Sequence, residues 1–164
     1  MKNFVSLILV GLIFVGCQQV KNNKQEVVDL KKEKEMVTLV LEKYVLANEK
    51  QDIDLVREIW ASSPDIVVIG TNSDEKLIGW DAIQKVMQRQ FDAFDDTYIS
   101  VHDQVIEINE TGNTAWFSEI LNYNYIYQGE AKQYEGLRFT GVLEKNNNDW
   151  FIVQSHMSIP GSPD

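Results

Sequence analysis

Six side chains combine the groups that could bind or transform a small molecule. The imidazole of His156 could accept or donate a proton near neutral pH, and Arg138 could hold a carboxylate through a bidentate pair. Gln154 adds a hydrogen-bonding group two residues before His156. The aromatic members of the set, which could form the walls of a pocket, are Trp60, Trp80 and Trp116. We interpret the six residues as the lining of one ligand pocket.

The set contains no paired acid and base, and this favours binding over catalysis. A general base that works near neutral pH needs a carboxylate or imidazole tuned by burial or by a charged neighbour. No nucleophile or oxyanion donor can be assigned around His156 from the sequence. We therefore predict a pocket that binds a small, partly apolar molecule, anionic if Arg138 faces it. A hydrogen-bonded core histidine is the alternative for His156.

The composition argues against several other classes of function. The 164 residues carry 25 acidic and 15 basic side chains, a net charge of −10, whereas nucleic acids are bound by clusters of Lys and Arg. Two histidines and one cysteine leave little for a transition-metal site. The chain has no phosphate-binding glycine loop, no dinucleotide fingerprint and no nucleophile elbow. We expect no cofactor, no metal and no nucleic-acid partner.

The beginning of the chain is typical of a targeting segment. Lys2 precedes an apolar run over 4–15, which is shorter than the roughly 20 residues that a membrane-spanning helix needs. The run Phe14-Val15-Gly16-Cys17 resembles a bacterial lipobox, in which the cysteine becomes lipidated and N-terminal. We predict a lipoprotein signal peptide over 1–16, followed by the lipidated Cys17 and a polar tether over 17–35. The protein would then be anchored in the bacterial cell envelope, on a membrane, facing the periplasm or the exterior.

After the tether the pattern changes to helices and then to strands. Apolar residues recur every three or four positions over 36–47, again after a capping Asp52, and a third time over 79–94. Beyond this third helix the period becomes two, which is typical of strands. The predicted strands are 65–70, 77–78, 97–108, 114–127, 134–145 and 150–158. Long strands in hairpin order predict a strongly curved antiparallel sheet with the helices on one face, an α+β domain over 36–160.

The last predicted hairpin decides which side chains line the pocket. Strict alternation places Ile152, Gln154 and His156 on one face of the last strand and Ser155 on the other. A four-residue loop over 146–149 would set Phe139 opposite His156 and leave a lone imidazole among apolar residues. A one-residue bulge would instead set Arg138 opposite His156, which gives a cationic pocket. Both registers remain open from the sequence. Because both faces of the strand are substantially apolar, we expect the second face to form a homodimer interface.

The closing residues also resemble a known family. The runs 138–145 and 150–160, separated by a polar turn, look like the SnoaL-like branch of the nuclear transport factor 2-like superfamily, as does the run 78–83. The Trp…His-x-Ser ending is also similar to the association domain of calcium/calmodulin-dependent protein kinase II. The resemblance covers roughly 36–160 and implies a cystatin-like roll with a conical cavity between curved sheet and helices. The superfamily includes isomerases, dehydratases, cyclases, transport adaptors and assembly domains, so the chemistry stays open.

The resemblance also supplies an alternative function. Ketosteroid-isomerase-like members combine a carboxylate base with a tyrosine and a second, protonated acid. An enzyme of this type, an isomerase, dehydratase or hydrolase, is therefore the alternative to a binding protein, and a dimeric adaptor is a weaker one. The candidate residues are Asp103, Glu107 and Glu119 with Tyr44, Tyr123 and Tyr125. We expect Glu119 to face solvent or an interface.

Overall fold

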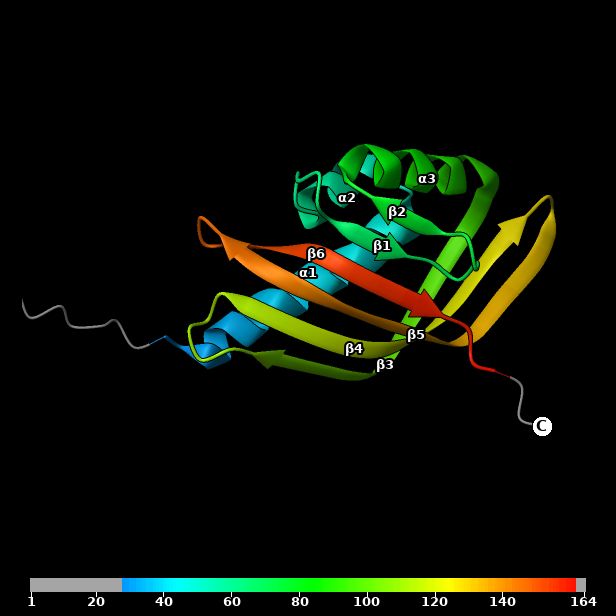
Figure 1. Ribbon diagram of the computed structural model, residues 1–164. Helices are drawn as coiled ribbons and strands as arrows, with labels where there is room; N and C mark the ends of the chain where they lie inside the picture. Colours follow the sequence, from blue (N-terminus) through cyan, green and yellow to red (C-terminus); the bar gives the residue numbers. More distant parts are fainter. Residues whose placement is uncertain (1–27, 162–164) are drawn as a thin grey trace, which may run out of the picture.

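The computed structural model describes residues 28–161, which form three helices and a curved sheet of six strands (Figure 1). The helices are α1 (Leu30–Lys50), α2 (Ile53–Ile59) and α3 (Trp80–Ala93). The strands are β1 (Val67–Ile69), β2 (Lys76–Ile78), β3 (Phe94–Ile108), β4 (Thr114–Tyr127), β5 (Glu130–Asn146) and β6 (Asp149–Ser158). The predicted α+β class is confirmed. The predicted signal peptide, Cys17 and most of the tether lie outside the described residues.

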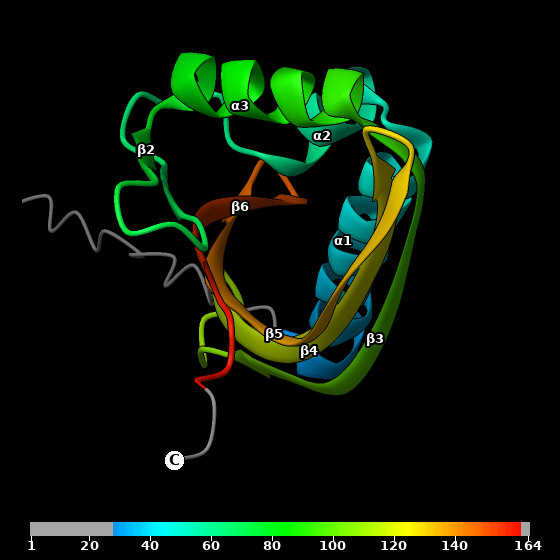
Figure 2. The same cartoon turned by 90° about the vertical axis from the view of Figure 1, so that its right-hand side faces the viewer.

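Helix α1 lies inside the curve of the sheet (Figure 2). Its start is capped by Asp29, whose Oδ1 accepts a hydrogen bond from the backbone N–H of Lys32 at 3.1 Å. Its spacing of three and four residues brings one stripe of side chains against the concave face of the sheet. The buried residues of this stripe are Val37, Leu41, Tyr44, Ala47 and Asn48.

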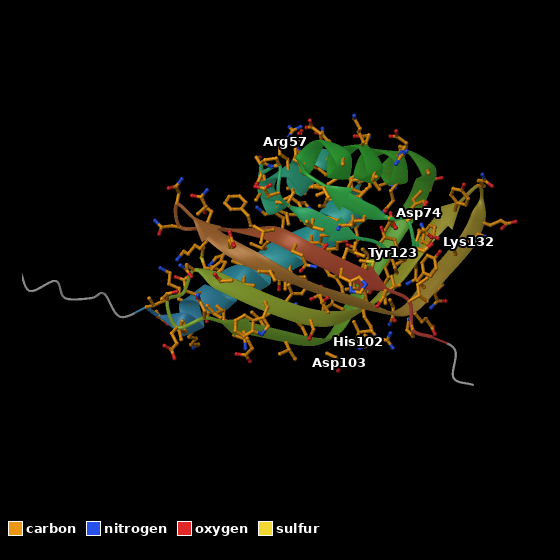
Figure 3. All side chains as sticks on the ribbon, in the orientation of Figure 1. Arg57, Asp74, His102, Asp103, Tyr123 and Lys132 are labelled. Atoms are coloured by element: carbon orange, nitrogen blue, oxygen red, sulfur yellow. The ribbon has the colours of Figure 1, made fainter. Side chains whose placement is uncertain are left out.

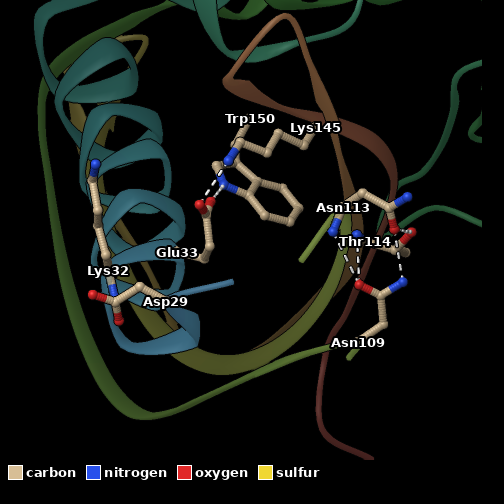
Figure 4. A network of polar contacts seen from close by, with 8 residues as sticks. All are labelled: Asp29, Lys32, Glu33, Asn109, Asn113, Thr114, Lys145 and Trp150. Atoms are coloured by element: carbon tan, nitrogen blue, oxygen red, sulfur yellow. Dashed lines mark hydrogen bonds and ion pairs between the residues drawn. The ribbon is translucent and has the colours of Figure 1, made fainter. Parts of the chain in front are cut away.

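The start of α1 corrects the predicted tether. Residues 30–35 belong to the helix, so the prediction of a solvated spacer is wrong for them. The physical reason is Glu33, which is 8% exposed in spite of its charge. Its carboxylate accepts hydrogen bonds from Nζ of Lys145 at 2.6 Å and from Nε1 of Trp150 at 2.9 Å (Figure 4). These long-range partners fix the first turn of the helix on the sheet.

Local signals set the other two helices. Asp52 caps α2 as predicted, since its Oδ1 accepts hydrogen bonds from two backbone N–H groups of the first turn at 3.0 and 3.1 Å. Helix α3 begins after Gly79, whose φ of 79° lies in the left-handed region that favours glycine. Its buried side chains are Ile83 and Phe91. With α2, α3 crosses the opening of the curved sheet (Figure 2).

The sheet has the strand order β2-β1-β6-β5-β4-β3. Strands β3 to β6 pair antiparallel in hairpin order, as predicted. The short strands β1 and β2 form an antiparallel hairpin of their own, and β1 joins the sheet parallel to β6. This arrangement places the β1–β2 hairpin beside the C-terminal half of β6, at the edge of the curve.

The turn of the last hairpin is tighter than the predicted four-residue loop. Strand β5 ends at Asn146 and β6 begins at Asp149, so only Asn147 and Asn148 connect them. Both have positive φ, 51° and 74°, which is the requirement of a type I′ turn and a conformation that asparagine tolerates. Next to this turn the pairing follows the first predicted register.

A β-bulge then moves the pairing away from both predicted registers. Val153 is the extra residue, and beyond it Thr140, not Phe139 or Arg138, pairs with His156. The bulge lies in β6, so the partner of His156 on β5 moves one residue towards the turn, from Phe139 to Thr140. The predicted bulge would have moved it one residue away from the turn, to Arg138. Because an inserted residue reverses the alternation of faces, the predicted assignment of faces is wrong beyond Val153. Ser155 therefore faces the concave side and His156 the convex side.

Candidate functional site

A hollow lies between the concave face of the sheet, α3 and the β1–β2 hairpin, where the family resemblance implies a cavity. Its volume is about 380 Å³, near the lower end of the range for small-molecule pockets. Its wall draws side chains from α1, α3 and all six strands. The aromatic side chains in the wall are Tyr44, Trp60, Phe94, Tyr123, Tyr125, Tyr134 and Phe139. We call this hollow the cavity.

Three wider hollows lie elsewhere on the described part of the molecule, and one of them, of about 410 Å³, lies between α1 and the start of β6. Another, of about 610 Å³, is on the convex side of the sheet, and the third, of about 800 Å³, lies at the N-terminal end of α1. The third is lined by loop asparagines and charged side chains, such as Asn113, Asn147 and Lys32. The cavity differs from all three because helices and both halves of the sheet contribute apolar side chains to one space.

The polar groups around Tyr123 are paired with one another. Nε2 of Gln90 donates a hydrogen bond to Oη of Tyr123 at 2.9 Å and lies 3.4 Å from Oδ1 of Asn48. The Tyr123 hydroxyl donates to the same Asn48 oxygen at 3.4 Å. Burial raises the pKa of Tyr123, so its phenol stays neutral. Tyr123 lies between the β4–β5 hairpin and α3 (Figure 3).

A row of aromatic rings leads from the cavity wall to the surface. Phe94 stacks on Tyr125 with ring centroids 4.0 Å apart, and Tyr125 stacks on Tyr134 at 6.0 Å. Tyr134 is 40% exposed and ends the row. Burial, followed by the neighbouring Tyr134, raises the pKa of Tyr125 to about 12. The rings therefore offer flat, neutral surfaces to a ligand.

The charged side chains in the cavity wall are Glu75, on the β1–β2 turn, and Arg89, on α3. A side chain on Gly70 would overlap the Glu75 carboxylate, so glycine at this position makes room for Glu75. Glu75 also accepts a weak hydrogen bond from the backbone N–H of Asn72 at 3.4 Å. Because the wall holds one charge of each sign, it favours neither anions nor cations.

Trp60 is the residue of the predicted set that the structure places in the cavity wall. It follows α2, is 3% exposed and forms a parallel bridge with Ile152 of β6. Its indole Nε1 is buried and has no hydrogen-bond acceptor among residues 28–161.

The other five residues of the set lie outside the cavity wall. Trp80 is half-buried at the start of α3, where the Arg57 guanidinium lies 5.9 Å from its ring centroid. Trp116 is 50% exposed on the convex face of β4. The remaining members, Arg138, Gln154 and His156, are also on the convex face of the sheet. The bulge at Val153 explains why Gln154 and His156 lie on the convex face. Since Arg138 and His156 both lie on that face, the basis for a cationic pocket is removed.

The candidate acids of the enzyme alternative differ in how deeply they are buried. Asp103 and Glu107 are exposed on β3, and Asp103 contacts the exposed His102 at 3.0 Å (Figure 3). Glu119 is 1% exposed, so the expectation that it faces solvent or an interface is wrong. Plain alternation in β4 explains this position, because Glu119 lies on the buried face together with Phe117 and Leu121. The bulge in β3 sets Gln104 opposite it, and Nε2 of Gln104 donates to Oε2 of Glu119 at 2.7 Å.

Glu119 is a buried carboxyl with only half of its hydrogen-bonding capacity used. Its Oε1 has no partner among the described residues. Burial raises the pKa of Glu119, and the hydrogen bond from Gln104 only partly opposes this. Tyr44, in the cavity wall, has its pKa raised by burial first and by Tyr123 and Glu119 as smaller causes. A buried carboxyl with a raised pKa thus lies near a phenol of the cavity wall.

Sequence reasoning did not find the amide pair of the cavity. Asn48 and Gln90 lie 42 positions apart on separate helices, and each occupies a polar position of an otherwise apolar stripe. An amide in such a stripe is the signal that could have identified them, because buried amides need partners.

The convex face of the sheet remains the predicted homodimer interface. Val105 and Trp116 are 53% and 50% exposed there, on neighbouring strands. Exposed apolar side chains of this size on one face are typical of interaction surfaces.

Two further findings concern the described part of the chain only. None of its helices combines the length and hydropathy that a membrane span requires. Between residues 28 and 161, no three His, Cys, Asp or Glu side chains gather in a way that could hold a metal ion.

The comparison with known families gives one extensive match. The model of the SnoaL-like domain family matches residues 37–162. No curated protein matches the chain.

Solved structures share the fold at low sequence identity. A nuclear transport factor 2-like superfamily protein from Salmonella enterica is 20% identical with a TM-score of 0.74, covering 82% of this chain and 96% of that one. A proposed scytalone dehydratase from Novosphingobium aromaticivorans is 12% identical with a TM-score of 0.72, covering 82% and 89%. A proposed calcium/calmodulin-dependent protein kinase II association domain from Xanthomonas campestris is 17% identical with a TM-score of 0.67, covering 77% and 87%. At these identities the likeness concerns the fold alone.

Proposed function

The chain belongs to the SnoaL-like domain family, and we propose that it binds a small, uncharged, largely apolar molecule in the cavity without transforming it. The observation that carries the proposal is that the side chains of Asn48, Gln90 and Tyr123 form hydrogen bonds with one another. These polar groups are therefore engaged and do not face an open space. A base prepared for proton transfer would instead have to reach the substrate directly.

The charges of the wall support an uncharged ligand. A buried carboxylate on the ligand would need a cation of its own, because transfer of an unpaired charge out of water is strongly unfavourable. Arg138 lies on the convex face, and the wall holds one cation, Arg89, and one anion, Glu75. A flat apolar molecule can stack on the aromatic rings without this penalty.

The test uses 2-acetylnaphthalene as a probe and thermal unfolding of the purified protein as the measurement. A probe at 100 times its dissociation constant stabilises the folded state by about 2.7 kcal/mol, which raises the midpoint temperature by several degrees. Met87→Trp should abolish the shift, because Met87 lines the cavity and a larger side chain fills it. Gln88→Trp, on the exposed side of α3, is the matched control and should keep the shift. An unchanged midpoint in the wild type would contradict the proposal.

Glu119 favours one second candidate, an isomerase or dehydratase. A protonated acid and a tyrosine hold the enolate oxygen in ketosteroid isomerase. Here burial raises the pKa of Glu119, and Glu119 in turn contributes to the raised pKa of Tyr44 in the cavity wall. Glu75, in the cavity wall, would be the base that removes a proton from carbon. The test is exchange of the methyl protons of 2-acetylnaphthalene in deuterated water, followed by NMR. Catalysed exchange that Glu75→Gln abolishes would replace the binding proposal with this one.

A homodimer through the convex face is a further part of the proposal. The exposed Val105 and Trp116 support it. Light scattering coupled to size-exclusion chromatography should give twice the monomer mass, and Trp116→Lys should give the monomer. A monomeric wild type at tens of micromolar would refute the dimer and leave the adaptor alternative without support.

The predicted anchor completes the proposed setting of the cavity. A lipidated Cys17 would hold the domain on a membrane of the bacterial cell envelope, because acyl chains contribute about 0.8 kcal/mol per buried methylene. Mass spectrometry of the protein produced in bacteria should show an acylated N-terminal Cys17, and Cys17→Ala should remain unacylated. An unmodified chain that begins at a later residue would overturn the anchor.

A further inference from the structure

The cavity has a largely apolar floor and a polar rim. Ile83 and Phe139, each 1% exposed, belong to the floor. The exposed polar residues of the wall are Thr71 and Asn72, on the β1–β2 turn, and Arg89, on α3. The β1–β2 hairpin lies beside α3 (Figure 2). Since a cavity opens where its wall residues are exposed, these polar side chains belong to the rim.

The polar groups of the rim have more free hydrogen-bonding capacity than those deeper in the wall. The amide and phenol groups inside are bonded to one another, and Ser155 adds a single hydroxyl to the floor. At the rim, Arg89 forms no ion pair within residues 28–161. Glu75 accepts only weak hydrogen bonds, at 3.4 and 3.5 Å, from Asn72. A polar group of a ligand therefore finds the larger number of partners at the rim.

We propose that the ligand is a flat apolar molecule with a hydroxyl at one end, bound with its apolar end on the floor and its hydroxyl at the rim. The inference rests on the proposed binding function and specifies the class of ligand. The carboxylate of Glu75 only accepts hydrogen bonds and the guanidinium of Arg89 only donates them, whereas a hydroxyl does both. A charged group on the ligand would instead meet a like charge in the same rim.

The aromatic row gives the apolar body of such a ligand a continuous surface. Phe94 and Tyr125 line the cavity and stack at 4.0 Å. Tyr134 continues the row and is 40% exposed, so the row reaches the open side of the cavity. A flat molecule that packs on these rings thus extends from the interior to the rim.

The test compares two probes of the same shape. In 2-propylnaphthalene a methyl group replaces the hydroxyl of 2-(2-naphthyl)ethanol, so the pair differs only at one end. Titration calorimetry on the purified protein should show the alcohol binding roughly 3- to 10-fold more tightly, the effect of one net hydrogen bond. An unpaired hydroxyl on an apolar floor would reverse this order, because burial of a polar group without a partner is unfavourable.

A double variant tests the two rim charges. Glu75→Leu combined with Arg89→Leu removes both charges, leaves the net charge unchanged and should make the two affinities equal. Asp81→Leu combined with Lys85→Leu is the matched control and should keep the wild-type ratio, because both residues are exposed on α3 and outside the cavity wall. A wild-type ratio in the rim variant would overturn the inference and favour Ser155 as the partner of the hydroxyl.

A measurement on the wild type covers the case in which the double variant fails to fold. A soluble gadolinium chelate broadens the NMR signals of protons that are accessible to solvent. In the bound alcohol, the protons next to the hydroxyl should be broadened more than the ring protons. The reverse pattern, or an alcohol that binds no more tightly than the hydrocarbon, would overturn this inference and leave the binding function standing. Failure of both probes to bind would overturn the binding function and this inference together.

Discussion

Two regions of the molecule place the same residue types in opposite situations. At the start of α1, the buried Glu33 accepts hydrogen bonds from the indole of Trp150 and the ammonium of Lys145 (Figure 4). Around the cavity, the indole of Trp60 and one oxygen of the buried Glu119 have no partner among residues 28–161. The first region is internally complete, and the second is not.

The pKa values of the two carboxyl groups, Glu33 and Glu119, are shifted in opposite directions. Burial opposes ionisation of Glu33, but the hydrogen bonds from Lys145 and Trp150 together outweigh it and hold its pKa below the ordinary value. Burial raises the pKa of Glu119, because its single hydrogen bond from Gln104 does not compensate the lost hydration. A buried carboxyl with a complete set of hydrogen-bond partners stabilises the fold. A buried carboxyl with an incomplete set lowers the stability of the fold, and a ligand that supplied the missing partner would restore it.

Glu33→Ala should produce the largest loss of stability. The substitution leaves the Trp150 indole unpaired and removes the ion pair of Lys145, so we expect a loss of about 2–3 kcal/mol. The measurement is urea unfolding of wild type and variant at pH 7. Glu35→Ala, on the exposed side of the same helix, is the control and should change the stability by less than about 0.5 kcal/mol. Equal effects of the two substitutions would refute the structural role of Glu33.

A comparison of two indoles tests the same contrast with a smaller effect. Trp150→Phe and Trp60→Phe remove the same group from two residues that are each 3% exposed. Only Trp150→Phe breaks a hydrogen bond, so it should cost about 1 kcal/mol more in urea unfolding than Trp60→Phe. If the two variants lost equal stability, the Trp60 indole would have a partner in the unliganded protein.

The sequence was sufficient for the fold because the signals that determine it are local. The helical period of α3, the capping Asp52 and the alternation in β4 each predict an element from its own residues. The start of α1 escaped prediction for the opposite reason. Glu33 meets Lys145 across 112 positions of sequence, and no local pattern distinguishes it from an exposed glutamate in a charged run.

The candidate site was less predictable because it depends on bulges. The extra residue at Val153 exchanges the faces of Ser155 and His156, and the bulge in β3 brings Gln104 to the buried Glu119. A bulge leaves the composition and period of a strand nearly unchanged, so parity arguments fail beyond it. Trp60 directly follows α2 and lies in the cavity wall, and no bulge separates it from the apolar period of that helix.

Glu119→Gln should produce the smallest effect on stability, and one that depends on pH. Because the pKa of Glu119 is raised in the folded state, the folded protein holds a proton that the unfolded chain releases above its ordinary pKa of about 4.3. The wild type should therefore lose this contribution as the pH rises, while the glutamine variant should not. The variant keeps an acceptor for Gln104, so the two proteins should be nearly equal at pH 4 and the variant should become the more stable one towards pH 8. Urea unfolding across this range measures the difference, with the exposed Glu107→Gln as a control that shows no such divergence. A variant that is less stable than the wild type at pH 8 would mean that Glu119 is ionised and paired, and the contrast with Glu33 would disappear.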